Sequence, residues 1–256
     1  MPEKVIITRP RAQAEPLARA VAALGREAVV LPLLDIEPLP DQSALKQALS
    51  RLGDYALVAF VSPNAIDAAF AHIAAWPAGV AIGVVGEGSR AALAKHGVDE
   101  RSATIHCPAH GEASDSEHLL LAMDLSRLAG RRVLIVRGES GRELMAAGFT
   151  AAGAEVAVVA AYRRAVPPLT AALAAQLAEL IATPNHWIIT SSEALRGLVD
   201  HVRTLDPQGG VAKLQQQHLV VPHARIAETA FSLGLDRVTQ TGSGDAGVLA
   251  ALQSQE

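Results

Sequence analysis

Short apolar runs rich in Val and Ile alternate along the chain with longer stretches in which Ala and Leu recur at helical spacing. A short run bounded by turn residues predicts a strand, and apolar residues that recur every three or four positions predict a helix. The first such unit is a strand over 4–8 followed by a helix over 12–24. Further strands are predicted over 27–34, 55–61, 80–85, 132–136, 155–161, 186–190, 218–221 and 237–241.

Most of these strands are apolar at nearly every position rather than at every second one. Runs of this kind are typical of strands buried on both faces, and strands that alternate with helices indicate βα units on parallel sheets. The predicted fold class is therefore α/β, with doubly wound parallel sheets.

The two halves of the chain repeat each other in one register. Sliding residues 4–34 by 128 positions onto 132–162 needs no gap. The matched pairs include Val5 with Val133, Arg9 with Arg137, Gly25 with Gly153 and Glu27 with Glu155. A second match, shifted by 129 positions, superposes 60–62 on 189–191. The repeat predicts an internal duplication and two similar domains.

Proline breaks near 37–40 and at 167–168 suggest where the chain passes between these domains. We expect an interleaved arrangement in which residues 1–36 and 167–256 form one α/β domain and residues 37–166 form the other, inserted one. The extended segments 33–38 and 161–167 would then pair as a two-stranded connector, with a ligand cleft between the domains. Two consecutive domains split near residue 125 would give the same periodicity, so the pattern alone leaves both arrangements open.

Composition narrows the function classes. The chain has 256 residues, half of them apolar, 19% charged and 3% aromatic, with a formal net charge of −4. No apolar stretch reaches the roughly 18 residues of a membrane span, and neither a basic face nor an aromatic platform for nucleic acid is present. With no signal-like start and a single cysteine, Cys107, we expect a cytoplasmic protein that binds neither membrane nor nucleic acid.

A glycine-rich turn is the sharpest alternative signal. Gly86-Glu-Gly88-Ser-Arg-Ala91 follows a predicted strand and matches the pattern of a dinucleotide-binding turn. It does not belong to the first βα unit of its domain, and no acidic residue follows at the spacing that would hold a ribose. We interpret it as a tight turn whose free N–H groups at a helix start attract anions. His106, Cys107 and His110 resemble metal ligands, but Pro108 separates them, so no metal is expected.

Polar residues that follow strands are the better candidates for a binding site. Arg9 and Arg137 occupy equivalent positions at strand ends, where α/β sheets bind ligands, and a guanidinium offers a bidentate fork to a carboxylate. We expect the two to face a cleft from opposite walls. Ser62, Ser191 and Ser192 also follow strands, as helix caps that can leave N–H groups for an anion.

The ordered set of motifs resembles the uroporphyrinogen-III synthase family over nearly the whole chain. The motifs are Thr8-Arg9-Pro10, Val61-Ser62-Pro63-Asn64, Val85-Gly86-Glu-Gly-Ser89, Leu134-Ile-Val-Arg137-Gly138-Glu-Ser-Gly-Arg142-Glu143-Leu144, Tyr162-Arg163-Arg164 and Thr190-Ser191-Ser192. The resemblance implies two flavodoxin-like, doubly wound domains joined by a two-stranded connector. It also implies the cyclisation of hydroxymethylbilane with loss of water and inversion of ring D, giving uroporphyrinogen III in tetrapyrrole (haem) biosynthesis.

The resemblance further implies a site. Tyr162 is the candidate acid that assists the departing hydroxyl, because a phenol stays protonated at neutral pH. The expected substrate-binding residues are Arg9, Ser62, Asn64, Gly86, Ser89, Arg137, Gly138, Arg142, Ser191, Ser192, His223 and Arg225. The last two stand where family members often carry a hydroxyl residue, and they are the ones that can replace it. No cofactor and no metal are implied.

Partners and alternatives follow from the same resemblance. The implied substrate is a small-molecule polycarboxylate, the chain is expected to be a monomer, and a transient hand-over from hydroxymethylbilane synthase is open. Two other function classes fit the residues. One is a two-lobed intracellular binding protein for an anionic small molecule. The other is a nucleotide-dependent oxidoreductase that uses Gly86 and Gly88.

Overall fold

The structure is a computed structural model, and it describes residues 3–109, 115–141, 143–242 and 244–254. Contacts within the chain divide it into two compact units. Unit 1 consists of residues 1–35 and 165–256, and unit 2 consists of residues 36–164. The chain therefore enters unit 2 once, completes it and returns to unit 1. That the units are independently folding domains stays a prediction.

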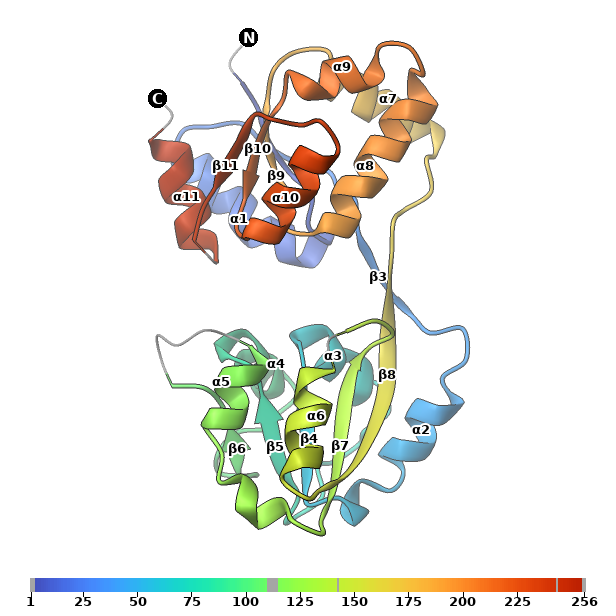
Figure 1. Cartoon of the computed structure of the whole chain (residues 1–256), viewed down its shortest axis with the longest axis vertical. Coiled ribbons are helices and arrows are strands. Elements are labelled where there is room, and N and C mark those ends of the chain that lie inside the picture. Colours follow the sequence, from blue (N-terminus) through green and yellow to red (C-terminus); the bar gives the residue numbers. More distant parts are fainter. Residues whose placement is uncertain (1–2, 110–114, 142, 243, 255–256) are drawn as a thin grey trace. The chain divides into compact units, whose positions relative to one another are not determined.

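Unit 1 contains a parallel sheet of five strands within the described residues, in the order β11-β10-β9-β1-β2. Its elements in chain order (Figure 1) are β1 (Val5–Ile7), α1 (Arg11–Ala23), β2 (Ala28–Val30), α7 (Ala171–Ile181), β9 (His186–Ile188), α8 (Ser192–Leu205), α9 (Gly210–Gln215), β10 (His218–Val221), α10 (Ala224–Ser232), β11 (Val238–Gln240) and α11 (Asp245–Gln253). The strand β1 thus pairs with one strand from each part of the chain that builds this unit, β2 and β9.

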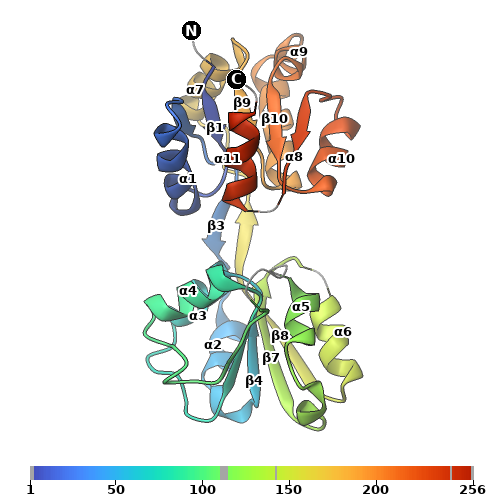
Figure 2. The same cartoon turned by 90° about the vertical axis from the view of Figure 1, so that its left-hand side faces the viewer.

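Both faces of the unit 1 sheet are covered by helices, because successive residues of a strand point to opposite faces. Val5 and Ile7 pack with α1 and α11, whereas Ile6 packs with the helices of the other face. Figure 2 shows α1 and α11 together in front of this sheet. Trp187 is the largest of the fully buried side chains. This double burial accounts for the uninterrupted apolar runs in the sequence.

Unit 2 contains a sheet of six strands within the described residues, in the order β3-β8-β7-β4-β5-β6. Its elements are β3 (Asp35–Pro38), α2 (Ser43–Leu49), β4 (Leu57–Phe60), α3 (Pro63–Phe70), β5 (Ala81–Val84), α4 (Glu87–Lys95), β6 (Ile105–His106), α5 (Ser116–Leu121), β7 (Arg132–Gly138), α6 (Leu144–Ala151) and β8 (Glu155–Ala165). The strands from β8 to β6 pair in parallel.

The unit 2 sheet is also covered on both faces. Val58 and Phe60 pack with α2, α3 and α4, whereas Leu57 and Ala59 pack with α5 and α6. The two groups of helices lie on either side of the sheet in Figure 2. Parallel strands place all their carboxyl ends at one edge, so the residues that follow β4, β5 and β7 gather there.

The two chain crossings between the units lie next to each other. β3 and β8 are hydrogen-bonded neighbours at the edge of the unit 2 sheet. Arg163 of β8 reaches Glu37 of β3, with Nε and Nη2 at 2.9 and 2.7 Å from the same carboxylate oxygen. The chain therefore leaves unit 1 and comes back to it on a pair of strands joined by backbone and side-chain contacts.

The duplicated glycines have a shared structural role. Gly25 follows α1 and Gly153 follows α6, and both adopt a left-handed backbone, with φ of +78° and +82°. Each donates its N–H to a carbonyl of the helix just ended, Ala22 and Thr150 respectively, at 2.9 Å. A residue with a side chain is strained in this conformation, which explains why glycine recurs at this place in both halves.

Every strand predicted from the sequence is present, and most are shorter than predicted. β8 is instead longer than predicted, because it continues to Ala165 and the predicted end was at 161. Pairing with β3 accounts for this extension. β6 was not predicted as a strand, since its two residues are too few to show a period. The α/β class and the two parallel sheets are confirmed.

Candidate active site

The start of helix α3 forms one part of the carboxyl edge of unit 2. Ser62 follows β4 and caps α3, and its Oγ accepts a hydrogen bond from the N–H of Ala65 at 3.2 Å. Pro63 occupies the first helical position, where its missing N–H costs nothing. Asn64 comes next on the same turn and is partly exposed. The sequence predicted both the cap and its place after a strand.

Tyr162 lies beside this helix start. Its side chain is buried, with 2% of the residue exposed, and its hydroxyl lies 3.1 Å from Oγ of Ser62. The phenol ring also lies close to Gly138, where an added Cβ would come within 3.0 Å of Cζ. The pairing of β7 with β8 shifts register between Arg137 and Gly138, next to the contact. The structure therefore brings Ser62, Gly138 and Tyr162 together.

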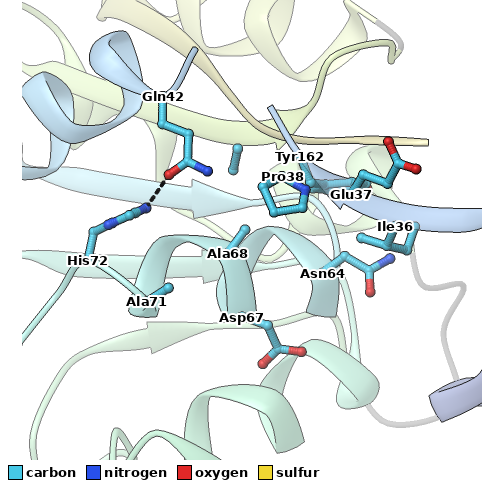
Figure 3. A pocket seen from close by; sticks show the side chains of 11 residues that line it. Ile36, Glu37, Pro38, Gln42, Asn64, Asp67, Ala68, Ala71, His72 and Tyr162 are labelled. Carbon is cyan, nitrogen blue, oxygen red and sulfur yellow. Dashed lines mark hydrogen bonds between the residues drawn. The ribbon is translucent and has the colours of Figure 1, made fainter. Parts of the chain in front are cut away.

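A pocket of about 360 Å³ lies between α3 and the segment that begins at β3. Its lining includes Tyr162, Asn64, Glu37, Gln42 and His72, and His72 Nε2 lies 2.9 Å from Oε1 of Gln42. Figure 3 shows the His72–Gln42 contact and the α3 side chains that line the pocket. Its two acidic side chains are engaged elsewhere. Glu37 bonds Arg163 and Asp67 bonds His96. This pocket could not be predicted from the sequence, because its lining residues lie in the separate segments 36–42, 64–72 and 161–162.

Helix α4 supplies a second helix start at the carboxyl edge of unit 2. Gly86 is its N-cap residue and directly follows the strand β5. Ser89 lies in the first turn of α4 and is buried, with 2% of the residue exposed. The Ser89 side chain is therefore withdrawn from solvent. At this helix start the groups that attract anions are the backbone N–H groups of the first turn of α4.

Arg137 is held by a neighbour that follows it in sequence. Nη2 of Arg137 lies 2.7 Å from Oε1 of Glu143, the residue before α6. The Arg137 side chain is 17% exposed and that of Glu143 is 70% exposed. An ion pair this open to solvent contributes little to stability, so another carboxylate can compete for the guanidinium. Arg142, which the sequence also selected, lies outside the described residues.

Unit 1 carries the equivalent arginine. Arg9 follows β1, and its Nη1 lies 2.5 Å from Oδ1 of Asp245, the first residue of α11. The Arg9 side chain is 15% exposed, and that of Asp245 is 44% exposed. Asp245 could not be predicted as the partner from the sequence, because 236 positions separate the two residues. Both repeated arginines are thus engaged by a carboxylate at a helix start.

The other unit 1 candidates lie at two helix starts. Ser191 caps α8 and accepts from the N–H groups of Glu193 and Ala194. Ser192 is buried, and its Oγ accepts a hydrogen bond from the hydroxyl of Thr229 at 2.9 Å. His223 is the N-cap residue of α10, Arg225 lies in its first turn, and both are exposed. Ser191 thus repeats in unit 1 the capping role of Ser62.

The prediction that the segment 106–110 holds no metal rests on Pro108, which separates the possible ligands. Burial lowers the pKa of His106 and raises that of the Cys107 thiol, which Glu87 and Glu100 raise further. His110 lies outside the described residues. Among the described residues there is no group of three or more His, Cys, Asp or Glu side chains placed to hold an ion. None of their helices has the length and apolar character needed to cross a membrane.

Two units with parallel strands, each covered by helices on both faces, define a two-unit α/β protein. A family model described as uroporphyrinogen-III synthase HemD matches residues 15–246. The chain belongs to the uroporphyrinogen-III synthase family.

Relatives and solved structures agree with this assignment. The uroporphyrinogen-III synthase of Salmonella typhimurium is 33% identical, over 97% of this chain and 99% of the relative. The one from Synechococcus elongatus is 30% identical, over 75% of this chain and 72% of the relative. In fold, the chain resembles uroporphyrinogen-III synthetase from Helicobacter pylori, with a TM-score of 0.65 at 12% identity, covering 99% of this chain and all of that one. The resemblance inferred from the motifs is confirmed, and neither alternative function class finds support.

Proposed function

We propose that this chain cyclises hydroxymethylbilane with loss of water and inversion of ring D, giving uroporphyrinogen III. The observation that carries the proposal is membership of the family, with 33% identity to a curated synthase over nearly the full length of both chains. The reaction belongs to tetrapyrrole biosynthesis and is a lyase reaction. The features of the carboxyl edges described above support it.

The substrate is a linear tetrapyrrole with eight carboxylates, so its binding needs many anion-binding groups. Arg9 and Arg137 supply guanidinium groups at strand ends, each paired with a carboxylate that is largely exposed. Helices that begin after Ser62, Gly86 and Ser191 supply backbone N–H groups. Local donors of this kind decide the affinity for a polyanion even where the net charge of the protein is −4.

For this reaction the protein needs to supply mainly the correct geometry of the substrate and one proton for the departing hydroxyl. The electron-rich pyrrole that carries the hydroxymethyl group, at the opposite end of the chain from ring D, expels this hydroxyl and becomes an azafulvene electrophile. The substituted carbon of ring D then attacks first, forming a spiro intermediate, and the ring reattaches inverted. Unconstrained closure gives the unrotated type I isomer, so the protein acts mainly by holding the chain in the productive geometry. The reaction requires neither a cofactor nor an activated nucleophile.

Tyr162 is the proposed source of the proton for the departing hydroxyl. A phenol O–H is a hydrogen-bond donor and can act as a general acid. Its hydroxyl belongs to a hydrogen-bonded pair with Ser62 at a helix start. The proposal also includes a monomeric protein that works in the cytoplasm and receives its substrate by transient hand-over from hydroxymethylbilane synthase.

The decisive experiment compares the isomers formed. Hydroxymethylbilane is generated enzymatically and incubated with the protein or with buffer, and the products are oxidised and separated as type I and type III. We expect the protein to give mainly type III and buffer to give type I. Type I alone in both samples, with a protein that unfolds cooperatively on heating, contradicts the proposed function.

A further inference from the structure

Two hydroxyl groups at the start of α3 differ in their access to solvent. Tyr162 is 2% exposed, whereas Ser62 is partly exposed at the carboxyl edge. The distance between the two oxygen atoms is 3.1 Å, within hydrogen-bonding range. Of the two hydroxyl-bearing residues, Ser62 is therefore the more exposed, whereas Tyr162 also contributes to the lining of the pocket beside α3.

Either hydroxyl of the Ser62–Tyr162 pair can be the donor, so the direction follows from the chemistry of the two groups. A serine hydroxyl has one proton to donate and two lone pairs to accept. One lone pair accepts the N–H of Ala65, at 3.2 Å. The phenol is the more acidic of the two hydroxyls, so it is the better donor to the second lone pair. This arrangement leaves the proton of Ser62 free to point away from Tyr162 and toward the carboxyl edge.

We propose that the Ser62 hydroxyl touches the departing hydroxyl of the substrate and that Tyr162 acts behind it as the donor that supplies the proton. The inference rests on the proposed function and changes the assignment of both residues. Ser62 becomes the catalytic residue, and Tyr162 acts through it.

The proton transfer balances in three moves. As the C–O bond to the terminal methylene breaks, Ser62 gives its proton to the leaving oxygen, which departs as water. The proton of Tyr162 moves to Oγ of Ser62 at the same time. The pyrrole nitrogen supplies the electrons for the new exocyclic double bond, and the azafulvenium then loses its N–H proton. That proton, passing through water, restores the phenol.

The surroundings favour this relay. The positive end of the α3 dipole lies at Ser62, where it stabilises negative charge that develops on the serine and phenol oxygens. Gly138 leaves room for the phenol ring, because any side chain at that position would contact it. The phenol is thus fixed behind the serine by packing, and it needs no movement to deliver its proton.

The test is a double-mutant cycle. The rate of type III formation is measured for the wild-type protein, Ser62→Ala, Tyr162→Phe and the double variant. Loss of one positioned donor lowers the rate about 10²-fold, at the lower end of the usual range because the pyrrole expels its hydroxyl readily. If the two groups act in series, the double variant is no slower than the slower single variant.

Ser62 also caps α3, so its removal needs a matched control. Thr170 caps α7 with the same geometry, accepting from Leu173 N–H at 3.2 Å, and it lies outside the proposed site. Thr170→Ala should lower the melting temperature as Ser62→Ala does and leave the rate at the wild-type value. Ser62→Thr keeps both the cap and the hydroxyl, and it should restore most of the rate lost in Ser62→Ala.

Two results would overturn the relay. One is a double variant whose loss is the product of the two single losses, which indicates that the groups act independently. The other is a fully active, folded Ser62→Ala beside a slow Tyr162→Phe, which indicates that the phenol reaches the substrate directly. Either result leaves the proposed function standing, whereas a wild-type protein that forms only type I rejects that function itself.

Discussion

At the scale of single residues, the two repeated arginines show how a net negative protein can bind a polyanion. Each is engaged by a carboxylate, Asp245 or Glu143, that remains 44% or 70% exposed. Pairs this accessible contribute about 0–1 kcal/mol, less than the roughly 1.5–3 kcal/mol of a hydrogen bond to a charged group in a desolvated site. A substrate carboxylate can therefore displace the internal partner.

The first prediction concerns Arg9. Arg9→Gln should raise the KM for hydroxymethylbilane about 10-fold, because the binding lost, about 1.4 kcal/mol, corresponds to that factor. The effect should shrink at high salt, which screens the interaction that is removed. KM is measured from initial rates of type III formation at two ionic strengths. Arg127→Gln, which removes an exposed surface pair with Asp124, is the control. An unchanged KM in the Arg9 variant would remove this residue from the site.

Substitution of Asp245, the ion-pair partner of Arg9, should have the opposite effect on KM. Asp245→Asn removes the carboxylate that competes with the substrate, so KM should fall, by up to about 5-fold for a pair worth 1 kcal/mol or less. The carboxylate also begins α11, and its loss should lower the free energy of unfolding by about 0.3–1 kcal/mol. Initial rates and denaturant unfolding give the two quantities separately. A rise in KM would show instead that Asp245 holds Arg9 in the binding orientation.

A histidine pair gives unit 1 a pH-dependent stability. The ring of His218 stacks on that of His186, with ring centroids 5.1 Å apart. Burial lowers the pKa of His218, and Arg237 and Arg26 lower it further, against the opposite effect of Glu3. The neutral ring is therefore favoured in the folded protein. The unfolded chain takes up the proton first as the pH falls below about 6.5, so stability decreases from there down to the lower pKa of the folded state.

His218→Gln should make that loss of stability shallower. Glutamine keeps a polar partner for Thr239, whose hydroxyl lies 2.8 Å from Nε2 of the histidine, and it does not titrate. The free energy of unfolding is measured in denaturant between pH 7 and pH 5 for both proteins. Equal slopes in the two proteins would mean that His218 takes up no extra proton on unfolding.

At the scale of secondary-structure elements, the contact between β7 and β8 places the candidate acid. Gly138 lies at the register shift of this pair, and the Tyr162 ring covers it. Gly138→Ala should displace the phenol and lower the rate of type III formation. In a Tyr162→Phe background the added Cβ still meets Cζ at 3.0 Å and Cε2 at 3.2 Å, but the rate should fall less because the displaced ring no longer carries the hydroxyl. The rate of type III formation is measured for the wild type, Gly138→Ala, Tyr162→Phe and the double variant.

Gly83→Ala is the matched control for this substitution. Gly83 lies in β5 of the same sheet, and a Cβ there would meet only side-chain carbons at 3.4 Å and beyond, apart from the backbone of Ala59 at 3.8 Å. We expect a rate close to that of the wild type. Equal losses in the two alanine variants would attribute the effect of Gly138→Ala to the sheet as a whole rather than to Tyr162.

Element order could be predicted from the sequence because burial on both faces leaves a strong apolar signal for each strand. The helix caps could be predicted too, since Ser62 and Ser191 act on N–H groups two or three positions away. The pairs that define the candidate site could not. Tyr162 and Ser62 are 100 positions apart, and only the sheet order places β8 where the phenol meets the start of α3.

At the scale of the whole molecule, the interleaved units make a prediction about folding. Residues 36–164 contain nearly all of the unit 2 sheet and both of its helical layers. This fragment should fold alone and unfold cooperatively, whereas residues 1–35 alone should not, because they hold only two strands of the unit 1 sheet. Circular dichroism during thermal unfolding of both fragments is the measurement. A 36–164 fragment without a cooperative transition would show that unit 2 depends on unit 1.

The position of β1 has a consequence for synthesis on the ribosome. β1 lies between the edge strand β2 and the strand β9. β9 is far along the chain from β1: Lys4, just before β1, donates its N–H to Asn185, just before β9, and the two residues are 181 positions apart. Translation delivers all of unit 2 in the interval between β1 and β9, and domains fold as they emerge. The nascent chain must therefore carry an exposed apolar βαβ segment while unit 2 completes itself. Codon-dependent pauses, chaperone binding and misfolding should all concentrate in this window.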